Sequence, residues 1–369
     1  MTFSWLFVPP VQASGTEIDM KKNKGLFLGV LLALPVMAAG CGHKEGENIK
    51  AGFEAVELSD YNGALQCFEQ AIVSEEDLEL AYRGCGITYL GMADYENSII
   101  AFEKALDNGG IFAGDLERDI NFYMATALYK DGQPDEAAKL LDAIIESDKK
   151  NADAYFLRGS ILIEGQDYEG GIYNFEQAVA NTSDSHNMKI DIYEVLAENG
   201  YEEKGREYLT RMLEEEKNLS DYEQGVVYFY LEDYDNARNH LEIAKQSAKK
   251  EKGKIVYMLG RTYEQLGDSN YAGVLYSDYL SEAPEDALIF NQLGLCKLEA
   301  GSYDEAIHAF EDALALGDVS MTQTLRYNQI VAYERAGDFA KAKSLMNSYL
   351  SAYPDDEAAR REAIFLGTR

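Results

Sequence analysis

Proline, histidine and cysteine are scarce in this chain of 369 residues, with 6, 4 and 4 copies respectively. Few prolines, and no strand-like alternation of apolar and polar residues, favour a helical protein. The histidines and cysteines are widely scattered, which leaves no cluster for a metal site or a disulfide framework. Basic residues are also few: 33 Lys and Arg stand against 65 Asp and Glu, giving a net charge of -32. We therefore expect no nucleic-acid partner, because its phosphates would be repelled.

Hydrophobic residues make up 46% of the chain, which is an ordinary fraction for a globular protein. The negative charge therefore belongs to a folded chain and not to a disordered acidic tail. Catalytic motifs are missing, since the sequence contains no G-x-S-x-G, H-E-x-x-H, P-loop, dinucleotide fingerprint or calcium loop. We expect a protein that is not an enzyme and that uses neither a metal nor another cofactor.

Residues 20–40 have the order of features of an export signal. Three lysines within residues 21–24 precede a stretch of sixteen uncharged residues, which is shorter than the roughly 20 that a spanning helix needs. The Ala-Ala-Gly-Cys sequence that ends at Cys41 resembles the lipobox of bacterial lipoproteins, in which the cysteine is acylated and becomes the new N-terminus. The alternative is a plain membrane anchor around a chance cysteine. Residues 1–19 lack Lys and Arg, so we interpret them as an over-extended start before Met20.

Cleavage before Cys41 defines an exported chain that is more acidic than the whole. Residues 1–40 hold three lysines and two acidic residues, so their removal leaves a net charge of -33. Residues 41–48 are short and polar, and we interpret them as a tether. The acidic domain is therefore expected to lie close to its membrane.

The remainder of the chain repeats one pattern. A small residue recurs about every 34 positions, a period typical of helix–turn–helix repeats, at Ala64, Ser98, Ala137, Gly171, Gly205, Ala237, Ala272, Ala306 and Ala342. Four positions after each small residue stands a large apolar one, as expected for one face of a second helix. The pattern predicts nine repeats over residues 45–354.

Glycine recurs twelve positions before the small residue, in six of the nine repeats, at Gly52, Gly86, Gly159, Gly225, Gly260 and Gly294. A glycine inside a helix costs about 1 kcal/mol relative to alanine, so we interpret these six as points where two helix backbones approach closely. Tyr193 and Ile330 replace the glycine in the fifth and ninth repeats, where we expect different packing. The pattern resembles the tetratricopeptide-repeat (TPR) family.

The resemblance implies an all-α fold, a right-handed superhelical solenoid of helix–turn–helix repeats whose first helices line a concave surface. Each repeat of such a solenoid packs on its neighbours, and no single globular core forms. Residues 355–369 follow Pro354 and are polar over most of a helical circumference. We expect them to form a C-terminal capping helix.

TPR geometry implies which residues of the first helices face the groove, from their phase relative to the packing glycine. The peptide-binding candidates at this phase are Arg83, Phe122, Tyr129, Phe156, Tyr222, Phe229, Tyr257, Arg261, Asn291 and Tyr327. Aromatic residues mixed with Arg and Asn are typical of peptide-binding surfaces. The alternative is that several of them only pack on a neighbouring second helix. The Lys and Asn clamp of chaperone-adaptor TPR proteins is absent, because Ile49, Phe53, Arg83 and Ile87 occupy its places.

The sequence therefore predicts a lipid-anchored TPR scaffold that mediates protein–protein interactions at the bacterial cell envelope. Its expected partner is a protein or peptide with a basic or apolar segment. An alternative is a dedicated subunit of an envelope assembly, secretion, pilus or polysaccharide-export machine. A wall-glycan hydrolase is a further alternative, but it needs two convergent carboxylates in a cleft, and no insertion in the repeats is long enough to build one.

Overall fold

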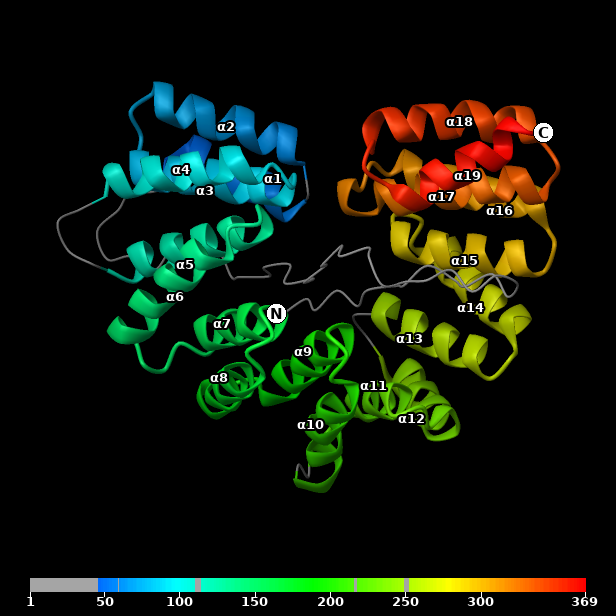
Figure 1. The fold of residues 1–369 in the computed structure, drawn as a ribbon, viewed down its shortest axis with the longest axis horizontal. Helices are drawn as coiled ribbons and strands as arrows, with labels where there is room; N and C mark the ends of the chain where they lie inside the picture. Colours follow the sequence, from blue (N-terminus) through cyan, green and yellow to red (C-terminus); the bar gives the residue numbers. More distant parts are fainter. Residues whose placement is uncertain (1–45, 59, 110–113, 216–217, 249–251) are drawn as a thin grey trace. The chain divides into compact units, whose positions relative to one another are not determined.

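The computed structural model describes residues 46–58, 60–109, 114–215, 218–248 and 252–369. Within these residues the regular secondary structure consists of 19 α-helices and no strand (Figure 1). The predicted all-α repeat architecture is confirmed. Cys41 and the predicted export signal lie outside the described residues. Among the helices that the structure describes, none is both long and apolar enough to cross a membrane.

Helices alternate along the chain as first and second members of a repeat. The first helices are α1 (Glu47–Glu57), α3 (Leu78–Gly91), α5 (Asp115–Lys130), α7 (Ala152–Glu164), α9 (Ser185–Glu198), α11 (Asp221–Tyr230), α13 (Lys252–Gln265), α15 (Ala287–Glu299) and α17 (Val319–Arg335). The second helices are α2 (Tyr61–Val73), α4 (Tyr95–Asp107), α6 (Pro134–Ser147), α8 (Tyr168–Asn181), α10 (Glu202–Glu215), α12 (Tyr234–Ser247), α14 (Ser269–Glu282), α16 (Tyr303–Ala315) and α18 (Phe339–Ala352). One further helix, α19 (Glu357–Gly367), follows them.

The described residues fall into two compact units: in sequence, unit 1 ends at Tyr208 and unit 2 begins at Leu209. In unit 1, α3 packs against α4 of its own repeat and also against the next first helix, α5. The same contacts recur in unit 2, where α13 packs against α14 and α15. Successive first helices therefore touch directly within each unit. We call the continuous surface that they form the inner face of that unit.

The turns within the repeats explain why Asp and Gly recur there. Asp60, Asp167 and Asp338 each precede a second helix, and each side chain accepts a hydrogen bond from the backbone N–H three residues later. Such N-caps satisfy a helix-end donor that would otherwise be unpaired. The residue before Asp167 and the residue before Asp338 have a left-handed backbone, as at Gly337 with φ 83°. Glycine adopts that conformation without steric cost, whereas Gln166 adopts it with a side chain present.

The packing glycines lie under large side chains, which corrects the explanation expected from the sequence. A Cβ atom on Gly294 would lie 2.5 Å from Cε1 of Phe310, the large residue sixteen positions later. Gly52 and Phe68 have the same relation. Backbone approach contributes in part, since the Gly171 carbonyl oxygen would lie 3.2 Å from a Cβ atom on residue 159. In five of the six repeats the glycine is thus needed mainly because a ring from the second helix fills the space of its side chain, and at Gly225 the leucine side chain of Leu241 does so.

Repeats without the glycine use other pairs of side chains at the same two positions. The third repeat pairs Ala125 with Leu141, and the ninth pairs Ile330 with Met346; all four side chains are buried. The fifth repeat reverses the arrangement: Tyr193 stands on the first helix and glycine on the second, where a Cβ atom on Gly205 would lie 2.9 Å from the tyrosine ring. The different packing expected at Tyr193 and Ile330 is therefore a redistribution of side-chain volume between the two helices.

Glu76, in the loop between α2 and α3, accepts hydrogen bonds from the start of α1. Its carboxylate accepts hydrogen bonds from Asn48 Nδ2 at 2.7 Å and from the backbone N–H of Ile49 at 3.3 Å. Gly46 lies against the same side chain. The N-cap residue of α1 makes no side-chain cap, so Glu76 serves that purpose from the next loop.

Glu76→Ala should lower the free energy of unfolding by about 1 kcal/mol, because a lost helix cap typically costs that amount. The measurement is urea denaturation followed by circular dichroism, together with hydrogen exchange of the α1 amides. Glu57→Ala, at an exposed position on α1, is the matched control and should change neither readout. Equal stability of both variants would contradict the capping role of Glu76.

Candidate functional site

Arg83 links three first helices on the inner face of unit 1. Its Nε atom lies 2.6 Å from Asp119 Oδ2 on α5. Its guanidinium lies 5.5 Å from the ring centroid of Phe53 on α1 and 5.6 Å from that of Tyr123 on α5. Stacked and paired guanidinium groups of this kind are held in one orientation. Arg83 therefore places little uncompensated positive charge on the inner face.

A second set of contacts joins α5, α7 and α9. The Tyr129 hydroxyl donates a hydrogen bond to Glu164 Oε2 at 2.7 Å. Burial lowers the pKa of Lys130 to about 8, and the carboxylates of Glu198 and Glu164 oppose that shift. Partial desolvation by the neighbouring helices also raises the pKa of Glu198, and the charge of Lys130 opposes this. Three successive first helices thus place interacting charges at corresponding positions.

Carboxylates outnumber cations on this face. Glu194 and Glu198 are one helical turn apart on α9, and Asp153 and Glu164 lie on the same stripe of α7 by helical periodicity. Asp153 and Glu198 are exposed, and the other two are half-buried. Two neighbouring cations are Arg83, which is paired with Asp119, and Lys130, which is half-buried near the carboxylates of Glu164 and Glu198. The inner face of unit 1 is therefore negative where solvent reaches it.

The inner face of unit 2 carries a buried polar cluster around Arg261. Arg261 Nη1 donates to the Tyr257 hydroxyl at 3.0 Å, and its Nε atom lies 3.4 Å from Glu264 Oε2. The hydroxyl of Tyr276 donates to Glu264 Oε1 at 2.7 Å. The ring of Tyr276 covers Gly260, as phenylalanine does in other repeats, and its hydroxyl reaches past the glycine. Burial raises the pKa of Glu264, so the carboxylate depends on these donors.

The ten predicted binding residues are more buried than an open surface requires. Tyr129, Phe156, Tyr257 and Asn291 are buried. The half-buried ones are Arg83, Phe122, Tyr222, Phe229, Arg261 and Tyr327. Phe156 shows the reason, since its ring packs 5.7 Å from that of Phe175 on the second helix of its own repeat. The alternative that some of these residues only pack within the repeats therefore applies to the four buried ones.

The candidates are divided between the two units. Arg83, Phe122, Tyr129 and Phe156 belong to unit 1, and the other six belong to unit 2. The carboxylates Asp153, Glu164, Glu194 and Glu198 were not among the candidates of the sequence analysis. Glu194 and Glu198 are four residues apart on α9, and Glu164 and Glu198 are one repeat period apart. These two spacings are the signal that could have identified the carboxylates.

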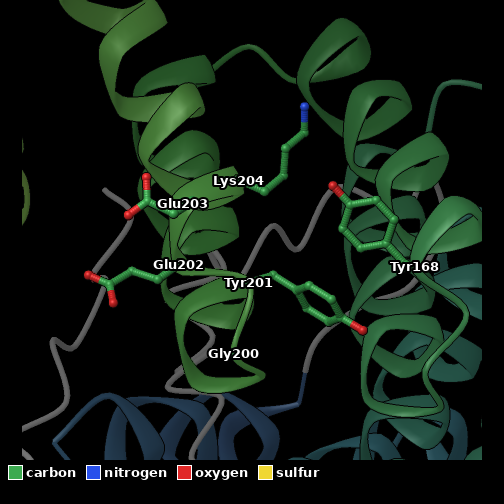
Figure 2. Close-up of a pocket in the computed structure, with 6 residues that line it drawn as sticks. All are labelled: Tyr168, Gly200, Tyr201, Glu202, Glu203 and Lys204. Atoms are coloured by element: carbon green, nitrogen blue, oxygen red, sulfur yellow. The ribbon is translucent and has the colours of Figure 1, made fainter.

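The described residues also include a shallow depression and a buried thiol. A depression beside the turn between α9 and α10 is lined by two tyrosine rings with centroids 4.9 Å apart (Figure 2), and its lining residues are Tyr168, Gly200, Tyr201, Glu202, Glu203 and Lys204. Burial raises the pKa of Cys85 to about 12, so its thiol is unreactive. No group of three or more potential metal ligands occurs within the part of the chain that the structure describes.

Comparison with known proteins agrees with the repeat geometry. Residues 124–186 and 291–357 match a family model described as "Tetratricopeptide repeat". The structure of yeast Tom70 superimposes with a TM-score of 0.51 at 13% identity, over 86% of this chain and 80% of Tom70. A tetratricopeptide repeat protein from Parabacteroides merdae gives a TM-score of 0.46 at 12% identity, over 69% of this chain and 98% of that protein.

These identities are low enough that the likeness to solved structures concerns the fold alone. The family assignment rests instead on the two matched segments and on the helix pairs that recur at the predicted period. The ring-over-glycine contact within those pairs belongs to the same pattern. The two matched segments are tetratricopeptide repeats, and the other helix pairs of the described residues share their all-α repeat architecture.

Proposed function

We propose that this protein is a lipid-anchored scaffold at the bacterial cell envelope that binds a basic segment of a partner protein along the inner face of unit 1. The observation that carries the proposal is the surplus of solvent-accessible carboxylates on α7 and α9, beside cations that are already paired or buried. TPR repeats support a scaffold that binds other proteins. The distribution of charge on the inner face of unit 1 supports the choice of a basic partner.

Electrostatics gives this surface both attraction and selectivity. A net charge of -32 accelerates the encounter with a cationic segment, and salt screens the effect. Once the partner is bound, Phe122 on α5 offers a half-buried aromatic contact. Acidic partners would meet like charges, which cost several kcal/mol when they are juxtaposed. The same features suit a dedicated subunit of an envelope machine, which is one form of the proposed scaffold.

Reversing two charges on α9 should abolish most binding. The first step is affinity capture of the partner from solubilised membranes, followed by calorimetry with the purified partner. Glu194→Lys/Glu198→Lys should weaken binding by about tenfold or more, because it places like charges opposite a basic segment. Wild-type affinity should also fall as the sodium chloride concentration rises.

The matched control is Glu103→Lys/Glu146→Lys, which makes the same change in net charge at exposed positions on α4 and α6. It should retain wild-type affinity at moderate salt, with unchanged circular dichroism. An equal loss in both double variants would show that only the net charge matters. Affinity that rises with salt would exclude a basic partner and favour an apolar one.

A further inference from the structure

One charged position recurs on three successive first helices of unit 1. Lys130 is the last residue of α5, Glu164 is the last of α7 and Glu198 is the last of α9, and each is 34 positions from the next. α7 contacts both α5 and α9 directly (Figure 1). Because the three residues share one phase on touching helices, they form a row across the inner face, with one positive charge followed by two negative ones. We call it the charged row.

Solvent reaches the charged row, and a hydrogen bond orients its central member. Glu198 is exposed, whereas Lys130 and Glu164 are half-buried. The Tyr129 hydroxyl donates a hydrogen bond to Glu164 Oε2 at 2.7 Å. A carboxylate accepts several hydrogen bonds, so Glu164 can still accept one from a ligand. Glu194 lies one helical turn before Glu198 on α9 and adds negative charge near that end of the row.

The spacing of the charged row limits the kind of segment that can match it. Helices in contact have axes about 8–10 Å apart, so a matching segment must present its charges at about that distance. Side chains three residues apart in a polyproline II segment point the same way and lie about 9.3 Å apart. Residues two apart on one face of a β-strand are separated by only about 6.6 Å. Residues seven apart on an α-helix are separated by about 10.5 Å.

A basic segment favours the extended match over the helical one. Segments rich in Lys and Arg contain too few apolar residues to fold by themselves, and they stay disordered until they bind. Polyproline II is a major conformation of such unfolded chains. The segment can therefore match the charged row without first forming a helix.

We propose that the partner segment is extended and carries two basic residues three positions apart, which pair with Glu164 and Glu198. Three positions further, opposite Lys130, it carries an acidic or uncharged residue. This inference rests on the proposed function, because it specifies the basic segment that the inner face of unit 1 binds. A third basic residue at that place would meet the like charge of Lys130, so the charged row selects a register and a pattern as well as a sign of charge.

Synthetic peptides of equal composition test the spacing with the full-length protein in detergent. Each peptide has one glutamate and two lysines among serines and alanines, with the charged residues two, three or seven positions apart and the glutamate at either end. Fluorescence anisotropy at low ionic strength gives the dissociation constants. We expect the three-residue spacing to bind about fivefold more tightly than the other two, because each surface ion pair contributes only modestly. Tightest binding at seven positions would indicate a helical partner and overturn the proposal.

Reversing the charge of Lys130 separates the charged row from general attraction. The readout is the ratio of affinities for two peptides of three-residue spacing, one with three lysines and one with the glutamate in place of the third. Lys130→Glu should shift this ratio toward the all-lysine peptide by about tenfold, because a like charge becomes an opposite one. Lys139→Glu, at an exposed position on α6, makes the same change in net charge and should leave the ratio as in the wild type. Equal ratios in both variants would overturn the proposal.

The charge-reversed double variant of α9 distinguishes failure of this inference from failure of the proposed function. If all three spacings bind equally well and Glu194→Lys/Glu198→Lys abolishes that binding, the spacing is wrong and the proposed function stands. If the double variant binds every peptide as the wild type does, with unchanged circular dichroism, both are wrong.

Discussion

Replacing Phe310 by alanine should lower the free energy of unfolding by about 3–5 kcal/mol, the usual cost of truncating a buried phenylalanine. The ring is fully buried, and it covers Gly294, which has no side chain that could fill the cavity. Repeats stabilise their nearest neighbours, so the loss should appear first in hydrogen exchange of α15 to α17. Urea denaturation gives its size. Tyr173→Ala, at an exposed position on α8, should change stability by no more than about 0.5 kcal/mol.

A double-mutant cycle tests the ring-over-glycine contact itself. Gly294→Ala alone should be destabilising, because its Cβ atom would lie 2.5 Å from the Phe310 ring. In a Phe310→Leu background the same change should be stabilising by up to about 1 kcal/mol, since alanine is the better helix former. The combination exists in the third repeat as Ala125 and Leu141. An effect of Gly294→Ala that is the same in both backgrounds would contradict the contact.

Cys41→Ala should abolish membrane anchoring, because the acyl chains would lose their attachment atom. We expect the wild type to remain in the membrane fraction after a carbonate wash and to incorporate labelled fatty acid. The variant should incorporate none, and it should be released or accumulate at the larger, unprocessed size. A lipid chain contributes about 0.8 kcal/mol per buried CH₂ group, so the change in partitioning is large.

The control for this experiment is Cys67→Ala, which removes a thiol on α2 and should leave both labelling and fractionation unchanged. A Cys41→Ala protein that stays in the membrane fraction at the mature size would exclude the lipobox interpretation. It would leave the plain membrane anchor as the explanation of the apolar segment. Neither outcome bears on the repeats, whose packing involves residues from Ile49 onward.

The repeated helix pairs could be predicted because their signal is local and recurs nine times. Spacings of four and seven residues mark one face of a helix wherever it occurs. The sequence predicted that the glycines allow two helix backbones to approach closely. In the structure, most of them instead make room for the ring of the residue sixteen positions later. The burial of Phe156 and Tyr257 could not be predicted from the sequence either. Helical phase gives the direction of a side chain but not how closely the next helix approaches it.

The contacts across the inner face are separated by about one repeat, which explains why a reading of single helices misses them. Arg83 and Asp119 are 36 positions apart, and Tyr129 and Glu164 are 35 positions apart. Comparing each first helix with the next at an offset of one period would bring both pairs into view.

The hydrogen bonds between Glu76 and the start of α1 determine where a mechanical force would first act on the protein. Suppose that lipid anchors Cys41 and that a bound partner pulls on a later repeat. The tension then passes through residues 46–49, where the carboxylate of Glu76 accepts hydrogen bonds from Asn48 and Ile49. The next contact that resists the force is the one between the Phe68 ring and Gly52, followed by the equivalent contacts in later repeats. Elements joined mainly to their neighbours are expected to yield in sequence under force. Such a chain behaves as an extensible link, which can lengthen by one repeat without releasing either end.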